Sequence, residues 1–157
     1  KAYLVLGCVP YSHLDAPCEF SPIDEVCHAI IKLASTPSRM IVFHPCNNHR
    51  IPLGDVLDIL GRICASPIKE VEWHDFETRI SKMMTEPNAD ITALQPLLAY
   101  QSSAGVTTSF IEYANEYTTQ VLYRLGFKWN YTSWDYVERF IKSIVALDYF
   151  STGDASL

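Results

Sequence analysis

The chain has 157 residues, 48% of them hydrophobic and 19% charged, which favours one folded domain and excludes wholesale disorder. Its net charge of −6 comes without any cluster of Lys and Arg, which excludes a nonspecific nucleic-acid binder. No apolar run approaches the roughly 18 residues that cross a bilayer, and residues 1–10 lack the order of a signal peptide, so we expect a cytoplasmic protein without a membrane partner.

The first clear element that the sequence predicts is a helix that begins near Pro22 and stops near Pro37. Ser21 is a suitable N-cap, Pro22 suits the first helical position, and Asp24 and Glu25 lie at the positive end of the helix dipole. Apolar residues recur at the spacing of one buried helical face. That face comprises Ile23, Val26, Cys27, Ile30, Ile31 and Ala34.

The middle of the chain predicts two strands on either side of a second helix. Met40 to His44 is a short apolar run with β-branched residues, which indicates a strand buried on both faces. A helix follows Pro52, and Ile68 to Trp73 alternates in the manner of a strand with one wet face. The apolar face of the helix comprises Leu53, Val56, Leu57, Leu60, Ile63 and Cys64.

After His74 the pattern is helical, with a weak point at Pro87-Asn88 and a loop candidate at 101–105. Gly126 marks the end of one helix, and Ser133 is a suitable N-cap for the last one. We expect residues 1–150 to form one domain and residues 151–157 to form a flexible tail. The last helix carries apolar residues at Trp134, Val137, Ile141, Ile144 and Val145.

One group of side chains near the N-terminus raises the question of catalysis. Ser12, His13, Asp15 and Cys18 contain a nucleophile and a base, which acyl transfer requires. Triad members are normally assembled from distant positions, however, and a polar cluster next to Pro17 favours a surface turn. The turn is the preferred interpretation.

Cysteine and histidine spacing gives no metal site. The spacing of His44, Cys46 and His49 matches no usual zinc pattern, and no fourth ligand lies nearby, so a turn is again preferred. Asn47-Asn48 would suit that turn, because Asn side chains bond to their own main chain. We expect all five cysteines to be reduced, buried thiols. They are Cys8, Cys18, Cys27, Cys46 and Cys64.

Several segments together resemble one enzyme superfamily. The segment Glu-Phe-Ser-Pro-Ile-Asp-Glu-Val at 19–26 resembles the start of the substrate-binding part of extended short-chain dehydrogenase/reductases. Within that superfamily the chain is similar to thioester reductase domains of nonribosomal peptide synthetases and carboxylic acid reductases. That similarity rests on 7–10, 41–48, 51–53 and the closing pattern of 119–150.

The resemblance implies an α/β (α+β) fold, namely the C-terminal part of such a reductase, with two or three short strands and a mainly helical substrate-binding subdomain. It also implies that the loop residues contact substrate. They are Pro10, Ser12, His13, Pro22 and Asp24. The family's glycine cluster and its Tyr with Lys four residues later are absent, so we expect no catalytic or cofactor-binding residue here.

The resemblance therefore implies the substrate-binding part of an NADPH-dependent thioester reductase that releases an acyl or peptidyl chain from a carrier protein. The fragment would be inactive alone. Its expected partners are the N-terminal NADPH-binding half of the same domain and an upstream carrier domain with its phosphopantetheine arm. Two alternatives stay open: a noncatalytic α/β interaction module, and the substrate part of another extended reductase or epimerase. Unpaired strand edges predict some self-association.

Overall fold

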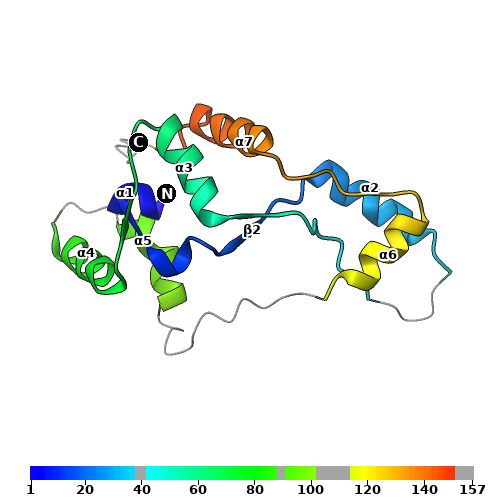
Figure 1. The fold of residues 1–157 in the computed structure, drawn as a ribbon, viewed down its shortest axis with the longest axis horizontal. Helices are drawn as coiled ribbons and strands as arrows, with labels where there is room; N and C mark the ends of the chain where they lie inside the picture. Colours follow the sequence, from blue (N-terminus) through cyan, green and yellow to red (C-terminus); the bar gives the residue numbers. More distant parts are fainter. Residues whose placement is uncertain (38–41, 88–90, 102–113, 151–157) are drawn as a thin grey trace. The chain divides into compact units, whose positions relative to one another are not determined.

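The computed structural model describes residues 1–37, 42–87, 91–101 and 114–150. This part of the chain is a mixed α/β structure, mainly helical, which confirms the expected fold class (Figure 1). The helices are α1 (Ala2–Leu6), α2 (Ile23–Ala34), α3 (Leu53–Ile63), α4 (Trp73–Thr85), α5 (Ile91–Gln101), α6 (Glu116–Arg124) and α7 (Trp134–Ala146). The strands are β1 (Cys8–Pro10), β2 (Pro17–Glu19), β3 (Arg50–Pro52) and β4 (Lys69–Val71), and a 3-10 turn, η1, covers Tyr11–His13.

The chain divides into two compact units. The first unit draws its described residues from 1–16, 52–109 and 134–157, and the second from 17–51 and 110–133. The expectation of one domain over 1–150 stays a prediction, and the expected tail, 151–157, lies outside the described residues.

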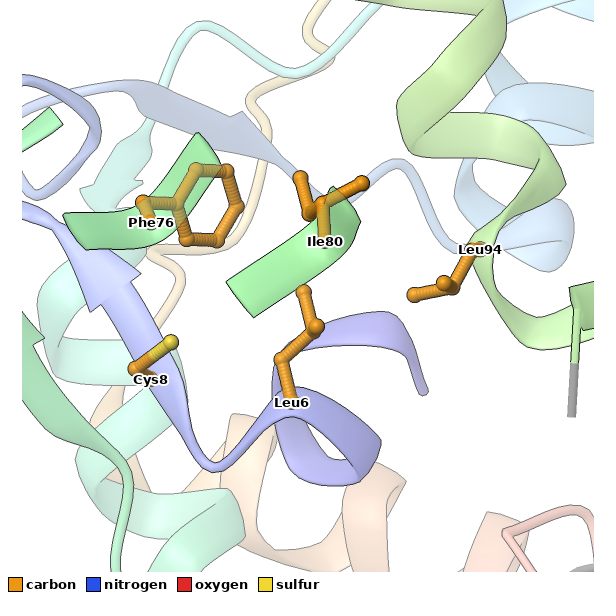
Figure 2. Close-up of a cluster of buried hydrophobic side chains, with 5 residues drawn as sticks. All are labelled: Leu6, Cys8, Phe76, Ile80 and Leu94. Atoms are coloured by element: carbon orange, nitrogen blue, oxygen red, sulfur yellow. The ribbon is translucent and has the colours of Figure 1, made fainter. Parts of the chain in front are cut away.

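The first unit is built on a parallel pair of strands, β1 and β4, in which Cys8 faces Lys69 and Pro10 faces Val71. Parallel strands need cover on their faces, and helices supply it here. Figure 2 shows how α1, β1, α4 and α5 each send apolar side chains into one cluster. The buried members are Leu6, Cys8, Phe76, Ile80 and Leu94.

Two further contacts fix the first unit. Arg79 donates from Nη1 to the Leu6 carbonyl oxygen at 2.8 Å, which satisfies an acceptor at the C-terminal end of α1. Helices α3 and α7 pack against each other and are seen side by side in Figure 1. Their buried residues are Leu57, Ile59 and Leu60 on α3 and Val137 and Ile141 on α7.

The second unit packs α2 against α6. As predicted, Gly126 ends α6, with a left-handed φ of 73°. The Phe127 and Gly126 N–H groups donate to the carbonyl oxygens of Leu122 and Tyr123 at 2.9 and 3.0 Å. This Schellman arrangement turns the chain so that Phe127 packs beside Leu122. The buried cluster of this unit comprises Ala29, Leu33, Leu122, Phe127 and Trp129.

The predicted strand at Met40 to His44 is not confirmed. Val42 to His44 form no strand, and 38–41 lie outside the described residues. Contacts to α6 replace the expected ladder: the His44 N–H donates to Thr118 Oγ1 at 2.9 Å, and the ring of Phe43 stacks on that of Tyr117 at 6.1 Å between centroids. An apolar run therefore packs on a helix here, which periodicity alone does not distinguish from a buried strand.

Two local predictions for α2 are wrong. Pro22, not Ser21, occupies the N-cap position, because Ser21 Oγ is used elsewhere. The residues of α2 that the structure buries are Ala29 and Leu33, which lie on a different side of the helix from the predicted apolar face. Of the six predicted positions only Val26 is partly buried, and Cys27 is exposed rather than a buried thiol.

The left-handed turn after α6 gives a first prediction. A Cβ added at Gly126 meets nothing within 4 Å, so replacing Gly126 acts through backbone strain alone. We expect Gly126→Ala to lower the free energy of unfolding by about 1 to 2 kcal/mol and Gly126→Asn to lower it by less, because Asn tolerates this conformation. Urea unfolding measures both values. Equal losses for the two variants would contradict the backbone argument.

Candidate functional site

The residues predicted to contact substrate fall into both units. Pro10 belongs to β1, and Ser12 and His13 belong to η1, all in the first unit. Pro22 and Asp24 stand at the start of α2 in the second unit. Pro10 is fully buried, whereas the side chains of Ser12 and Asp24 are exposed. Ser12 and Asp24 are thus the members of this set most open to a ligand.

His13 lies in a box of aromatic rings. The Tyr3 hydroxyl is 2.9 Å from His13 Nδ1. The imidazole also meets the rings of Trp73 and Phe76 edge-on, at 5.5 and 6.1 Å between centroids. Helices α1 and α4 supply these neighbours, so the folded core of the first unit positions the histidine.

Burial in this box lowers the pKa of His13 below its ordinary value. A neutral imidazole presents one acceptor and one N–H donor. Donation from the Tyr3 hydroxyl to Nδ1 would leave the proton on Nε2, so the pair is suited to orient one hydrogen bond rather than to carry a charge.

The segment around His13 is a turn, as preferred from the sequence. The N–H groups of Leu14 and Ala16 donate to the carbonyl oxygens of Tyr11 and His13 at 3.2 and 3.1 Å. Burial raises the pKa of the Cys18 thiol, which disfavours the thiolate that a nucleophile needs. These observations favour the turn over a catalytic triad.

In the second unit, Asn47 joins three segments of chain. Its side chain is buried, and both ends of the amide are hydrogen-bonded: Nδ2 donates to the carbonyl oxygens of Phe20 and Asn130, each at 3.1 Å, and Oδ1 accepts from the His49 N–H at 2.9 Å. Its own N–H donates to Ser21 Oγ at 2.9 Å. The bond to His49 is the main-chain turn predicted for Asn47-Asn48.

A neighbouring network holds α2 to the same loop. Asn130 donates from its backbone N–H and from Nδ2 to the Glu25 carboxylate, at 3.1 and 2.5 Å. Thr132 Oγ1 donates to the His49 carbonyl oxygen at 2.9 Å. From the sequence, Glu25 was expected only to interact favourably with the helix dipole. Its hydrogen bonds to Asn130 could not be predicted, because Asn130 lies more than a hundred residues away in the chain.

A shallow pocket of about 150 Å³ opens beside this network. Its floor is apolar, and Lys128, His49 and Asn48 lie among its polar lining. The indole Nε1 of Trp129 is buried there without a hydrogen-bond acceptor among the described residues. Sequence reasoning assigned Trp129 to core packing, which is confirmed, but gave no sign of the pocket. The lining residues are Asn48, His49, Thr119, Leu122, Tyr123, Phe127, Lys128 and Trp129.

Metal ligands do not gather in the described ranges of the chain: no three His, Cys, Asp or Glu side chains there could hold one ion. Cys46, one of the three residues weighed for zinc, instead accepts at Sγ from Asn115 Nδ2 at 3.1 Å. The five cysteines are free thiols.

Within the described residues no helix has both the length and the apolar character to cross a membrane.

The four glycines that the structure describes do not form a nucleotide-phosphate cradle. Gly7 and Gly126 have positive φ, and each follows the end of a helix. Gly54 and Gly61 lie in α3, where an added Cβ would contact Leu14 and the Ser66 carbonyl oxygen. A phosphate site needs glycine backbone at a helix N-terminus that faces the ligand. The glycines in the described part of this chain serve helix ends and close packing instead.

Comparison with known proteins identifies the fold. The chain is similar to the structure of a thiolation-reductase di-domain from an archaeal non-ribosomal peptide synthetase, with 27% identity and a TM-score of 0.78 over 96% of this chain. It also has the fold of the Aureusimine biosynthetic cluster reductase domain, at 17% identity and a TM-score of 0.66 over 93% of this chain. No family model and no curated protein matches.

The resemblance to reductase domains of nonribosomal peptide synthetases is therefore confirmed, and the chain has the fold of part of such a domain. It spans 30% of the length of the di-domain chain and 38% of the other reductase chain. Most of each of those two chains therefore has no counterpart in these 157 residues.

The Asn47 network gives a second prediction. Replacing the buried Asn47 with Ala leaves two carbonyl groups and one N–H without their partner, so we expect a loss of about 2 to 4 kcal/mol in the free energy of unfolding. The exposed neighbour is a matched control, and Asn48→Ala should cost less than about 0.5 kcal/mol. Chemical denaturation compares the two. A similar small loss in both variants would refute the role of Asn47.

The His13 box gives a third prediction. The pKa of His13 is lowered in the folded chain, so the unfolded chain takes up a proton more readily as the pH falls. Stability is then full above a pH of about 6.5 and is lost as the pH falls towards the folded pKa. His13→Gln should show a smaller loss between pH 7.5 and 5. Denaturation at each pH tests this, and an NMR titration that places the His13 pKa above its ordinary value would overturn it.

Proposed function

We propose that this chain is the substrate-binding portion of an NADPH-dependent thioester reductase in a nonribosomal peptide synthetase. The complete enzyme would accept an acyl or peptidyl thioester from a carrier domain and release the chain by reduction. The observation that carries the proposal is the similarity to a reductase joined to a thiolation domain, at 27% identity over nearly the whole of this chain. NADPH would bind to the portion of the enzyme outside these residues.

The role of this chain would be recognition. Ser12 and the neighbouring Tyr11 are exposed on a turn that the aromatic box of His13 holds in place. Such a turn can offer hydroxyl groups and an aromatic surface to an acyl chain and its amide groups. Asp24 is exposed at the start of α2, where it can accept a hydrogen bond from a substrate or from the cofactor-binding portion. The chain's own residues would thus bind and orient the thioester.

The test uses the longer polypeptide that the parent gene encodes, with the segment that precedes this chain included. We expect it to oxidise NADPH in the presence of an acyl-pantetheine thioester, and the 157-residue chain alone to give no turnover. A folded longer polypeptide that binds no NADPH would overturn the proposal.

A pair of variants in the same assay separates recognition from helix stability. Asp24 and Asp55 each lie in the first turn of a helix, so Asp24→Asn and Asp55→Asn should each cost about 0.3 to 1 kcal/mol of stability. Only Asp24→Asn should also lower kcat/KM, by about tenfold, because it alone removes a charged hydrogen-bond acceptor from the proposed site. Equal kcat/KM values for the two variants would mean that Asp24 only stabilises the helix and does not contact the substrate.

A further inference from the structure

The pocket on α6 is lined by polar side chains that have no partner in the described part of the chain. Lys128 is exposed and forms no ion pair there. The side chains of Asn48, His49 and Thr119 form no hydrogen bond there. Trp129 is 4% exposed, and its Nε1 is buried without an acceptor among the described residues. Unpaired buried donors are rare in folded proteins, and a small apolar pocket with several polar groups in its wall is typical of a ligand site.

The charge of the lining favours an anion. Lys128 is a cation, and neither Asp nor Glu is among the lining residues, although the whole chain has a net charge of −6. The Glu25 carboxylate lies close by, but both of its oxygens accept hydrogen bonds from Asn130. Ammonium, indole, amide and hydroxyl groups all donate hydrogen bonds. The pocket therefore offers donors and one positive charge to a ligand that accepts.

Hydrogen bonds within the second unit hold the wall of the pocket in place. The His49 N–H donates to Asn47 Oδ1, and the His49 carbonyl oxygen accepts from Thr132 Oγ1, each at 2.9 Å. The ring of His49 meets that of Tyr131 edge-on at 5.3 Å between centroids. The residues that follow α6 are fixed by the left-handed turn at Gly126. A wall that is already ordered loses little freedom when a ligand binds.

We propose that this pocket binds a small carboxylate with a short apolar body. Lys128 would pair with the carboxylate, and a carboxylate oxygen would supply the acceptor that Trp129 Nε1 lacks. The buried side chains of Leu122 and Phe127 would contact the apolar body. A volume of about 150 Å³ suits such a molecule, since cavities of about that size hold benzene.

This site goes beyond the proposed function and does not depend on it. None of the groups proposed to contact the thioester, such as Ser12 and Asp24, is among the lining residues of the pocket. The site also lies wholly within the second unit, to which all of its lining residues belong. Binding can therefore be measured without turnover and without NADPH.

The indole N–H signals of the 157-residue chain report this binding by NMR. Titration with pentanoate should move the Trp129 Nε1–H signal downfield to a plateau, because a new acceptor deshields that proton. We expect a Kd of about 1 to 10 mM, an ordinary affinity for a ligand of this size. Trp73 and Trp134 belong to the first unit, so their signals are internal controls that should stay in place.

Matched ligands and variants test the parts of the site. Pentanamide keeps the acceptor and the apolar body without the charge, and acetate keeps the charge without the body, so each should bind about tenfold more weakly. Lys128→Gln should weaken pentanoate by about tenfold, and the fold should persist because Lys128 is exposed. Lys82→Gln removes the same charge from an exposed position in the first unit and should leave the affinity unchanged.

Four outcomes overturn the inference. Equal affinities for pentanoate and pentanamide, or an unchanged affinity in Lys128→Gln, mean that the pocket does not recognise an anion. Equal movement of all three indole signals means that the ligand associates with the chain nonspecifically. A Trp129 signal that stays in place at ten times the highest expected Kd means that the pocket binds no carboxylate.

Discussion

The second unit depends on one buried amide. Residues 42–49 form no helix or strand, so their backbone groups need partners other than a regular ladder. Asn47 accounts for two of these partners, because its own N–H donates to Ser21 Oγ and its Oδ1 accepts from the His49 N–H. Its Nδ2 also donates to the carbonyl oxygens of Phe20 and Asn130, which lie outside this stretch. A buried amide with all its groups paired fixes one geometry, because every alternative leaves a polar group unpaired in an apolar setting. The start of α2 and the turn after α6 are thereby tied to the same loop.

Helix α2 is tied to this loop at its first turn. The Glu25 carboxylate accepts hydrogen bonds from the backbone N–H and from Nδ2 of Asn130. Beyond this turn, Ala29 and Leu33 pack in one buried cluster with Leu122 and Phe127. Ile23, Ile30 and Ile31 lie on another side of the helix and are exposed.

The distribution of chemistry along the chain fits a binding role. The neutral, aromatic-boxed His13 orients a hydrogen bond and carries little charge, and the described glycines end helices or allow close packing. What the chain offers instead is a fixed turn with exposed Tyr11 and Ser12 and a carboxylate at the start of α2. Under the proposed function these groups would contact the substrate.

The sequence by itself determined what depends on neighbours along the chain. The start of α3 after Pro52, the glycine turn after α6, the turn at 11–16 and the Asn47 bond to His49 all follow from local backbone chemistry, and the sequence predicts each. Only the tertiary structure decided which apolar face of α2 is buried, that Val42 to His44 pack on α6, and that Glu25 binds Asn130. Those choices rest on contacts between residues far apart in sequence, which periodicity cannot rank because each apolar face satisfies it equally well.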